Sequence, residues 1–438
     1  MSSLQEAWQS FPQAAGDLDE YGVGDLSPSI AIAPHEASSM ALALKLACQE
    51  ESVCVPWGGG LQQDLGFIPS RYDGAISTRS INRVVDYQPG DLTVTVEAGM
   101  TLAELQRVLF EHNQFVPLES PEPQRETIGG LLATGRSALL RCSYGGPRDQ
   151  VIGIACAMLD GNVVHGGGRV VKNVAGYDVC KLFTGSMGTL GMIVEATFKV
   201  RPLPSVRRTW IGVWETAEQS DEALAAVMES AISPSWLQAM DPGVMNALGH
   251  RFSIDLDGKL WGIGLGADGH EDLSAWMIAQ AGEVAHPTRH WIMDDGKSAR
   301  VRHMLIEACA PRRDLFLKLS AASSDVFPLM QQIRQRCIAL GSLTPHCAAA
   351  ASNGVIYLDV RCEGAAGEAA AVTLTEWANE IVEKSEGCCV VGRCAISLRR
   401  RLPMWGRSTS TRALMRQLRD RMDPRWTLNR GRLFEEEH

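Results

Sequence analysis

The sequence predicts an α+β protein with more than one domain. Its 438 residues are too many for one ordinary hydrophobic core. Short strand and helix patterns separated by glycine turns fill residues 28–204, and longer helix patterns alternate with strand patterns over 205–392. The second pattern is typical of helices packed on one face of an antiparallel sheet. Pro202 and Pro204 predict a boundary between the two regions, because proline ends strands and stiffens linkers.

We therefore divide the chain into a lead-in over 1–27, a region of short strands and helices over 28–204, an α+β domain over 205–392 and an arginine-rich segment over 393–438. Hydrophobic periodicity predicts helices over 37–48, 101–111, 218–230, 271–281, 325–340 and 368–385. It predicts strands over 53–55, 93–96, 151–159, 163–164, 192–200, 260–265, 315–319 and 354–360. Asp160-Gly161 predicts a hairpin turn, and Thr101 with Glu104 predicts a helix-capping box.

Composition and charge narrow the function. A net charge of -10 argues against nucleic-acid binding. Residues 1–19 have no signal-peptide pattern, and no apolar run reaches the roughly 18 residues of a membrane span. We expect a cytoplasmic protein that reaches the inner membrane only through partners. The twelve cysteines form no C-x-x-C pair, so reduced core thiols and no metal cluster are expected.

Three glycine-rich segments are the candidate binding elements. The first, Pro56 to Gly66, follows a strand, and its consecutive glycines could turn backbone N–H groups toward an anion such as a pyrophosphate. The second, Glu126 to Gly135, places two glycines in an apolar helical pattern, which costs about 1 kcal/mol per glycine. The third runs from Gly166 to Gly191. Taken alone, each segment could also be a purely structural feature, such as a flexible turn or a place of tight packing, and not a binding site.

Together, the motifs resemble one family. Pro56-x-Gly-Gly-Gly60, Val96-Glu-Ala-Gly-Met-Thr-Leu102, Thr127-Ile-Gly-Gly130, Lys172-Asn-Val-Ala-Gly-Tyr-Asp178 and Gly185-Ser-Met-Gly-Thr-Leu-Gly191 follow one another in this order. The order resembles the FAD-binding (PCMH-type) domain of the vanillyl-alcohol oxidase/p-cresol methylhydroxylase superfamily, which implies two α/β subdomains over 28–204. Within that superfamily, the chain is similar to the FAD-binding subunits of glycolate oxidases. Asp423 to Arg432 resembles the family's C-terminal signature, with Arg430 in place of a proline.

The resemblance implies a role for each matched segment. Gly58, Gly59 and Gly60 would wrap the FAD pyrophosphate, and Thr127, Gly129 and Gly130 would flank the diphosphate and ribityl chain. Lys172 to Asp178 and Gly185 to Gly191 would approach the adenosine or the isoalloxazine, while Asn429 and Arg432 would reach back from the C-terminal segment. The other residues assigned to the cofactor are Pro56, Leu61, Gln62, Ile128, Gly135, Arg148, Asp149, Lys172, Asn173, Ala175, Gly176, Tyr177, Asp178, Gly185, Gly188, Gly191 and Ile193.

The resemblance also implies what kind of subunit this is. The first glycine loop offers no His or Cys for a covalent link, so we expect a non-covalent FAD. The family's catalytic members carry a histidine-rich motif in the substrate domain, which is missing here, and Met187 stands where they have Glu. We therefore expect an FAD subunit that works beside a catalytic FAD subunit and an iron–sulfur subunit in the oxidation of glycolate or another small 2-hydroxyacid. No catalytic residue or metal ligand is assigned.

Several alternatives stay open at this stage. The chain could be a self-sufficient FAD-dependent 2-hydroxyacid dehydrogenase, or a scaffold subunit that has lost its flavin. Gly264 to Gly269 matches G-x-G-x-x-G, but a glycine turn is the simpler interpretation. The twelve arginines between Arg393 and Arg432 form either a solvated helix face or a contact surface for an acidic partner or the flavin phosphates.

Overall fold

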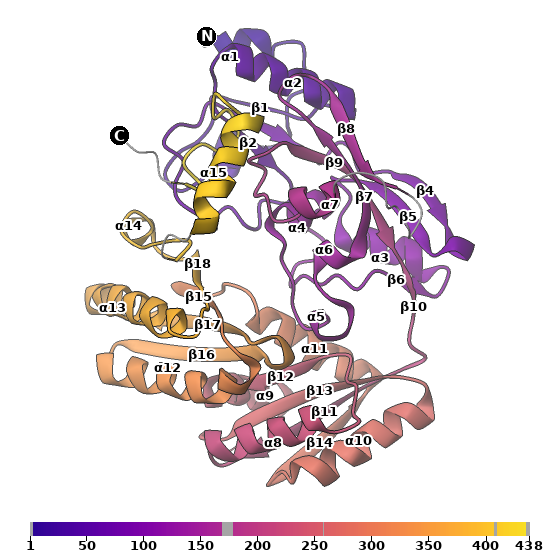
Figure 1. The fold of residues 1–438 in the computed structure, drawn as a ribbon, viewed down its shortest axis with the longest axis vertical. Helices are drawn as coiled ribbons and strands as arrows, with labels where there is room; N and C mark the ends of the chain where they lie inside the picture. Colours follow the sequence, from indigo (N-terminus) through magenta and orange to yellow (C-terminus); the bar gives the residue numbers. More distant parts are fainter. Residues whose placement is uncertain (1–2, 169–177, 257, 407–409, 435–438) are drawn as a thin grey trace. The chain divides into compact units, whose positions relative to one another are not determined.

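The computed structural model describes residues 3–168, 178–256, 258–406 and 410–434 (Figure 1). The chain forms two compact units. The first contains the described residues up to 137, from 145 to 203 and from 410 onward. The second contains residues 138–144 and the described residues between 204 and 406. The expected fold class is confirmed.

The first unit has two main sheets. A parallel sheet has the order β1 (Ile30–Ile32), β3 (Gly74–Ser77), β2 (Cys54–Trp57). An antiparallel sheet has the order β4 (Val84–Gln88), β5 (Thr93–Glu97), β9 (Met192–Lys199), β7 (Val151–Ala157), β8 (Val163–Gly167). The predicted hairpin at Asp160-Gly161 joins β7 to β8. A short pair, β6 (Gln114–Phe115) and β10 (Arg201–Pro202), completes the strands.

Helices cover these sheets. They are α1 (Ser3–Ala7), α2 (Ala37–Gln49), α3 (Leu102–Phe110), α4 (Ile128–Thr134), α6 (Pro147–Gln150), α7 (Val179–Phe183) and α15 (Ser410–Met422), with short 3-10 turns η1 (Leu18–Tyr21) and η2 (Pro89–Asp91). Thr101 caps α3 by accepting the N–H of Glu104, although the predicted return bond from the Glu104 side chain is absent among the described residues. Leu4 and Trp8 are fully buried in this unit's core, which ties the N-terminal segment to α2.

The second unit contains one antiparallel sheet of eight strands. Its order is β14 (Arg289–Asp294), β11 (Val206–Trp214), β13 (Trp261–Gly269), β12 (Leu237–Met240), β16 (Leu343–Ala350), β17 (Val355–Cys362), β15 (Leu315–Ser320), β18 (Cys389–Arg393). The associated helices are α5 (Arg141–Tyr144), α8 (Ala217–Glu229), α9 (Pro242–Phe252), α10 (Glu271–Ala285), α11 (Asp295–Ala308), α12 (Val326–Leu340), α13 (Gly364–Glu383) and α14 (Ile396–Arg399), with η3 (Ser323–Asp325) and η4 (Ala351–Asn353).

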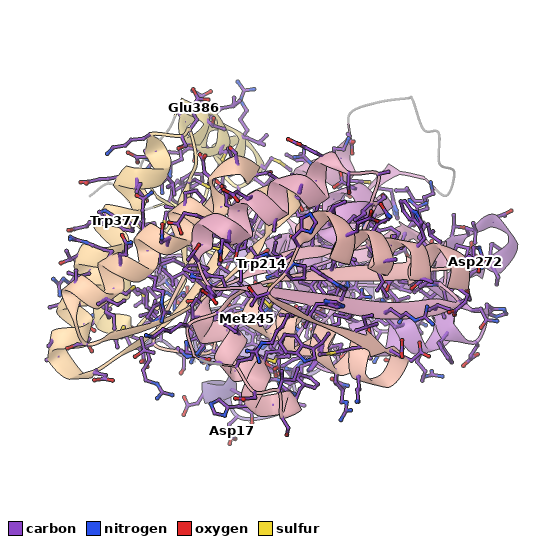
Figure 2. All side chains as sticks on the ribbon, turned by 90° about the horizontal axis from the view of Figure 1, so that it is seen from below. Asp17, Trp214, Met245, Asp272, Trp377 and Glu386 are labelled. Carbon is purple, nitrogen blue, oxygen red and sulfur yellow. The ribbon has the colours of Figure 1, made fainter. Side chains whose placement is uncertain are left out.

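Helices lie against both faces of this sheet, which corrects the expectation of one covered face. Trp214 donates to the Ala285 carbonyl of α10 on one face. Thr209 lies on the same strand as Trp214 and is separated from it by an odd number of positions. Because side chains alternate between the two faces of a strand, Thr209 faces the other side, where it hydrogen-bonds Ser298 of α11. Met245 of α9 packs against Gly262 of β13. Figure 2 labels Trp214 and Met245 in this unit.

The G-x-G-x-x-G match is part of a strand, so the predicted glycine turn is wrong. Gly264 and Gly266 lie inside β13, which pairs antiparallel with both β11 and β12. A Cβ at Gly266 would collide with the Trp236 indole. These glycines therefore make room for neighbouring side chains, and the parallel βαβ setting of a dinucleotide site is missing.

Candidate functional site

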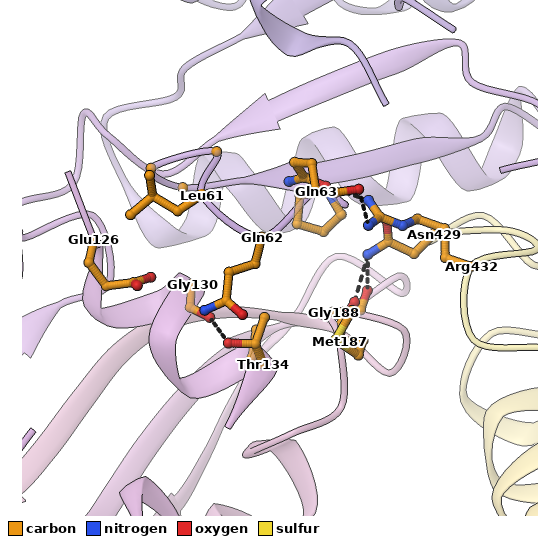
Figure 3. Close-up of a pocket in the computed structure, with 15 residues that line it drawn as sticks. Leu61, Gln62, Gln63, Glu126, Gly130, Thr134, Met187, Gly188, Asn429 and Arg432 are labelled. Carbon is orange, nitrogen blue, oxygen red and sulfur yellow. Dashed lines mark hydrogen bonds between the residues drawn. The ribbon is translucent and has the colours of Figure 1, made fainter. Parts of the chain in front are cut away.

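A cavity in the first unit brings together four segments that are distant in the sequence (Figure 3). They are the loop after β2, the start of α4, the turn at Met187-Gly188 and the C-terminal segment. The cavity encloses about 530 Å³ of empty space, part of it open to solvent. Its lining residues are Pro56, Gly58, Gly59, Gly60, Leu61, Gln62, Gln63, Glu126, Gly130, Ala133, Thr134, Met187, Gly188, Asn429 and Arg432.

The glycine loop after β2 presents unpaired backbone donors. Arg79 donates to the carbonyl oxygens of Gly58 (3.0 Å) and Gly59 (3.4 Å), which fixes the orientation of these peptides. The N–H groups of residues 58–61 have no hydrogen-bond partner among the residues that the structure describes. Gly60 has φ +74°, a conformation that favours glycine. A row of free N–H groups is the kind of backbone nest that binds phosphate oxygens.

Side chains are excluded from this loop by its surroundings. A Cβ at Gly58 would overlap the Thr127 hydroxyl, and a Cβ at Gly59 would overlap the backbone carbonyl of Arg125. The loop therefore lies directly against the segment that leads into α4. This close approach requires glycine at both positions.

The start of α4 contributes a wall of the cavity. Ile128 and Gly129 donate their N–H groups to the carbonyls of Met100 and Ala98, and Gly130 donates to the Thr127 hydroxyl. A Cβ at Gly129 would lie 2.9 Å from the Ala98 Cβ, so this glycine serves packing. Gly130 instead borders the cavity, and its N–H is already bonded.

The C-terminal segment completes the cavity beside β2. Cys54 donates to the Thr427 carbonyl and accepts from the Asn429 N–H, so the segment runs alongside the strand that leads into the glycine loop. Asp423, fully buried, accepts the N–H groups of Thr427 and Leu428 and holds this turn in place.

Two side chains of this segment reach the cavity. Asn429 donates to the Met187 carbonyl at 2.7 Å, and Arg432, only 3% exposed, donates to the carbonyls of Gln63 and Leu65 and to the Gln63 side chain. Figure 3 shows Arg432 beside Gln63 and Asn429 above Gly188. The arginine supplies a buried positive charge to the cavity that the free N–H groups also line.

Unpaired polar atoms mark the cavity as a ligand site. Gln62 Nε2 and Asn429 Oδ1 are buried and find no hydrogen-bond partner among the described residues, although both side chains line the cavity. Buried polar atoms normally find a partner, so each such atom calls for an explanation. A bound polar molecule would satisfy both.

Glu126 gives the opposite side of the cavity an acidic group. Its side chain is 2% exposed, and its Oε2 accepts from Ser120 at 3.0 Å and from Arg136 at 3.4 Å. Burial raises the pKa of Glu126 above its usual value, while Arg136 and Ser120 oppose this shift.

The cavity contains many but not all of the residues assigned from the sequence. Those that line it are Pro56, Gly58, Gly59, Gly60, Leu61, Gln62, Gly130, Gly188, Asn429 and Arg432. Those that the structure places elsewhere are Thr127, Ile128, Gly129, Gly135, Arg148, Asp149, Asp178, Gly185, Gly191 and Ile193. Lys172, Asn173, Ala175, Gly176 and Tyr177 lie outside the described residues.

Several of the assigned residues that do not line the cavity have other contacts in the structure. Ile128 is fully buried in the core, and Asp149 accepts the Gly146 N–H at the start of α6. Asp178 caps α7 and pairs with Lys181 at 2.8 Å. The cavity is also lined by residues that belong to the three glycine-rich segments but received no individual role from the sequence, namely Gln63, Glu126, Ala133, Thr134 and Met187. The one sequence feature that could have indicated Glu126 is its position directly before Thr127, which caps α4.

Among the described residues, side chains do not group into a metal site. No group of three or more His, Cys, Asp or Glu side chains in this part of the chain could hold a metal ion. The twelve cysteines are free thiols, seven of them buried. No described helix is long and apolar enough to cross a membrane.

Comparison with protein-family models identifies the region around the cavity. Residues 28–167 match the model of the FAD binding domain (FAD_binding_4). The match includes the glycine loop, Glu126 and α4, and therefore most of the cavity's lining.

Curated relatives resemble parts of the chain. Glycolate oxidase subunit GlcD of Bacillus subtilis (strain 168) is 28% identical over 214 residues, which is 49% of this chain and 46% of the relative. D-lactate dehydrogenase [cytochrome] 1, mitochondrial, of Saccharomyces cerevisiae is 28% identical over 259 residues, 56% of this chain and 44% of the relative. Glycolate oxidase subunit GlcE of Escherichia coli (strain K12) is 36% identical over 130 residues, 30% of this chain and 37% of the relative. The chain thus spans less than half the length of these relatives.

A solved structure shares the fold. An alkyldihydroxyacetonephosphate synthase aligns over 93% of this chain and 78% of its own, with a TM-score of 0.71 and 17% identity. At this identity the likeness concerns the fold alone. The free N–H groups, the buried arginine and the unpaired polar atoms of the cavity suit a dinucleotide cofactor with a pyrophosphate. Residues 28–167 therefore form an FAD-binding domain, and the cofactor of this chain is FAD.

Proposed function

We propose that this chain is the FAD-binding subunit of a glycolate oxidase-like oxidoreductase, which oxidises glycolate to glyoxylate and passes the electrons to partner subunits. The observation that carries the proposal is the row of unpaired N–H groups over residues 58–61 beside buried Arg432, within a matched FAD-binding domain. Relatives named as glycolate oxidase subunits support the substrate class and the assembly.

The residues would divide the work of holding the cofactor. The N–H groups of the glycine loop would bind pyrophosphate oxygens, with Arg432 neutralising their charge. Arg79 would keep the loop in its binding orientation through the two carbonyls it holds. Asn429 would offer its free Oδ1 to a donor on the cofactor. When bound, FAD would accept two electrons and pass them on within the complex.

We further propose that the cofactor is held without a covalent bond. The described residues that line the cavity include neither His nor Cys, the residues that tether flavins in covalent relatives. Acid precipitation should therefore release intact FAD into the supernatant.

The proposed partners are a catalytic FAD subunit and an iron–sulfur subunit. The test is reduction of an artificial electron acceptor by glycolate and by D-lactate, measured for the purified FAD-loaded chain alone and again after addition of those subunits. Turnover only in their presence supports the proposal. Turnover by the chain alone would instead establish a self-sufficient 2-hydroxyacid dehydrogenase, and a colourless chain that takes up no FAD would contradict both.

A further inference from the structure

Glu126 stands out among the residues of the cavity because of its charge. It is the only acidic side chain among the described lining residues, and it is almost completely buried. A carboxylate near a site for pyrophosphate repels the phosphates unless a cation, here its partner Arg136, offsets the charge. Its presence there requires a role other than phosphate binding.

The surroundings of Glu126 fix one carboxylate oxygen and leave the other free. Oε2 accepts from the Ser120 hydroxyl and the Arg136 guanidinium. Oε1 has no partner among the described residues. It lies 3.7 Å from the position that a Cβ at Gly130 would take, so the missing side chain of Gly130 leaves room beside it. Figure 3 shows the carboxylate pointing toward Gly130 and Gln62.

The backbone around Glu126 cannot easily move the carboxylate away. Its N–H donates to the Glu122 carbonyl at 2.9 Å, and its own carbonyl accepts the Leu102 N–H at 2.8 Å. Both bonds pin the residue immediately before the capping Thr127. The free oxygen is therefore held in place before any ligand arrives.

The cavity therefore contains two kinds of hydrogen-bonding group, donors in one place and an acceptor in another. The glycine loop offers free N–H donors, as a phosphate requires, whereas Oε1 of the ionised Glu126, whose other oxygen pairs with Arg136, offers an acceptor, as a hydroxyl requires. FAD contains both kinds of group, because hydroxyls of the ribityl chain and of the adenosine ribose flank its pyrophosphate. We propose that Glu126 Oε1 accepts a hydrogen bond from a hydroxyl of the bound FAD, and that this contact sets the position of the cofactor along the cavity. The inference rests on the assignment of FAD to this cavity.

The decisive variant is Glu126→Gln, and Glu122→Gln is its matched control. Gln keeps the volume of Glu, but the hydrogen bonds from Arg136 and Ser120 direct its carbonyl oxygen toward them and its NH₂ donor toward the cavity. Glu122 lies four residues away on the surface, half exposed and paired with Arg125, and does not line the cavity. Dissociation constants for FAD, FMN, ADP and inorganic pyrophosphate would be measured by flavin fluorescence and calorimetry.

The two kinds of ligand should respond in opposite directions. Loss of a hydrogen bond to a charged group should weaken FAD binding by about ten- to a hundredfold. Pyrophosphate, which has no hydroxyl, should bind equally well or more tightly, because a negative charge has been removed. A parallel loss for FMN but not ADP would identify a ribityl hydroxyl, and a parallel loss for ADP but not FMN a ribose hydroxyl.

Other outcomes would overturn the proposal. Unchanged FAD binding in Glu126→Gln, or an equal loss for all four ligands, would show that Oε1 does not receive a hydroxyl. Glu122→Gln should behave as wild type throughout. If Glu126→Gln does not fold by circular dichroism, Glu126→Asp retains the charge while withdrawing it from the cavity, and it should show a smaller selective loss for FAD. A wild-type chain that binds no FAD would refute the assignment of the cofactor itself. FAD binding of equal strength in the wild type and in Glu126→Gln would refute only the role of Glu126.

Discussion

Gly59→Ala tests whether the glycine loop is the pyrophosphate site. The added Cβ would overlap the carbonyl oxygen of Arg125. That carbonyl cannot readily give way, because the Arg125 N–H is bonded to the Glu122 carbonyl and the following residue is held at both its N–H and its carbonyl. The glycine loop must move instead, together with its free N–H groups.

The structure sets the size of the expected effect. Overpacking of this kind costs about 1–3 kcal/mol of folding stability. A displaced loop also loses hydrogen bonds to a charged ligand, worth about 1.5–3 kcal/mol each, so the loss of one bond should weaken FAD binding by about ten- to a hundredfold. Fluorescence titration with FAD and thermal unfolding without FAD measure the two effects separately.

Gly90→Ala provides the control. Nothing lies within 4 Å of a Cβ at Gly90, which is remote from the cavity lining, so this variant should bind FAD as wild type does. If Gly59→Ala also binds FAD with wild-type affinity, the loop does not hold the pyrophosphate and the reasoning is refuted.

Three further perturbations are expected to have defined outcomes. Asn429→Ala removes the 2.7 Å bond to the Met187 carbonyl and the free Oδ1, and calorimetry should show FAD binding weakened by about tenfold; an unchanged affinity would exclude Asn429 from the site. Arg79→Gln releases the two loop carbonyls and should weaken FAD binding while changing the melting temperature of the FAD-free chain little; a large melting shift with intact binding would give Arg79 a purely structural role. Burial and nearby arginines lower the pKa of His346 from 6.5 to about 4. As the pH falls, the His346 imidazole therefore takes up a proton in the unfolded chain before it does so in the folded chain. The free energy of unfolding should drop by about 1–2 kcal/mol between pH 7 and pH 5. We expect the lower value, because water screens the partly exposed ring. Urea unfolding should show a smaller drop in His346→Asn, and an identical drop would contradict the assignment.

The sequence could predict the fold and the cavity where a residue's role depends on local spacing. The glycine loop follows directly from a buried strand, and the resemblance of the C-terminal segment to the family implied roles for Asn429 and Arg432, both of which line the cavity. Similarly, the N-cap Thr101 and the Asp160-Gly161 hairpin depend on residues within a few positions of each other, and both are confirmed, although the predicted return bond from the Glu104 side chain is absent among the described residues.

Roles that depend on distant neighbours could not be predicted. Gly129 and Gly130 are adjacent, but Ala98 packs against the first while the cavity borders the second. The glycine spacing in β13 matches that of a nucleotide-binding loop. Gly266 nevertheless lacks a side chain because the Trp236 indole occupies that space. Glu126 begins a predicted binding segment but received no role of its own from the sequence, because its contacts with Ser120 and Arg136 arise only on folding.

The cofactor content of the purified chain tests the central claim most directly. The chain would be acid-precipitated after purification, and the supernatant analysed for flavin by chromatography and absorption. The structure predicts that FAD appears in the supernatant in stoichiometric amount, or that the cofactor-free chain gains flavin absorption bands when FAD is added. A chain that releases no flavin and takes up none would contradict the assignment of the cavity to FAD.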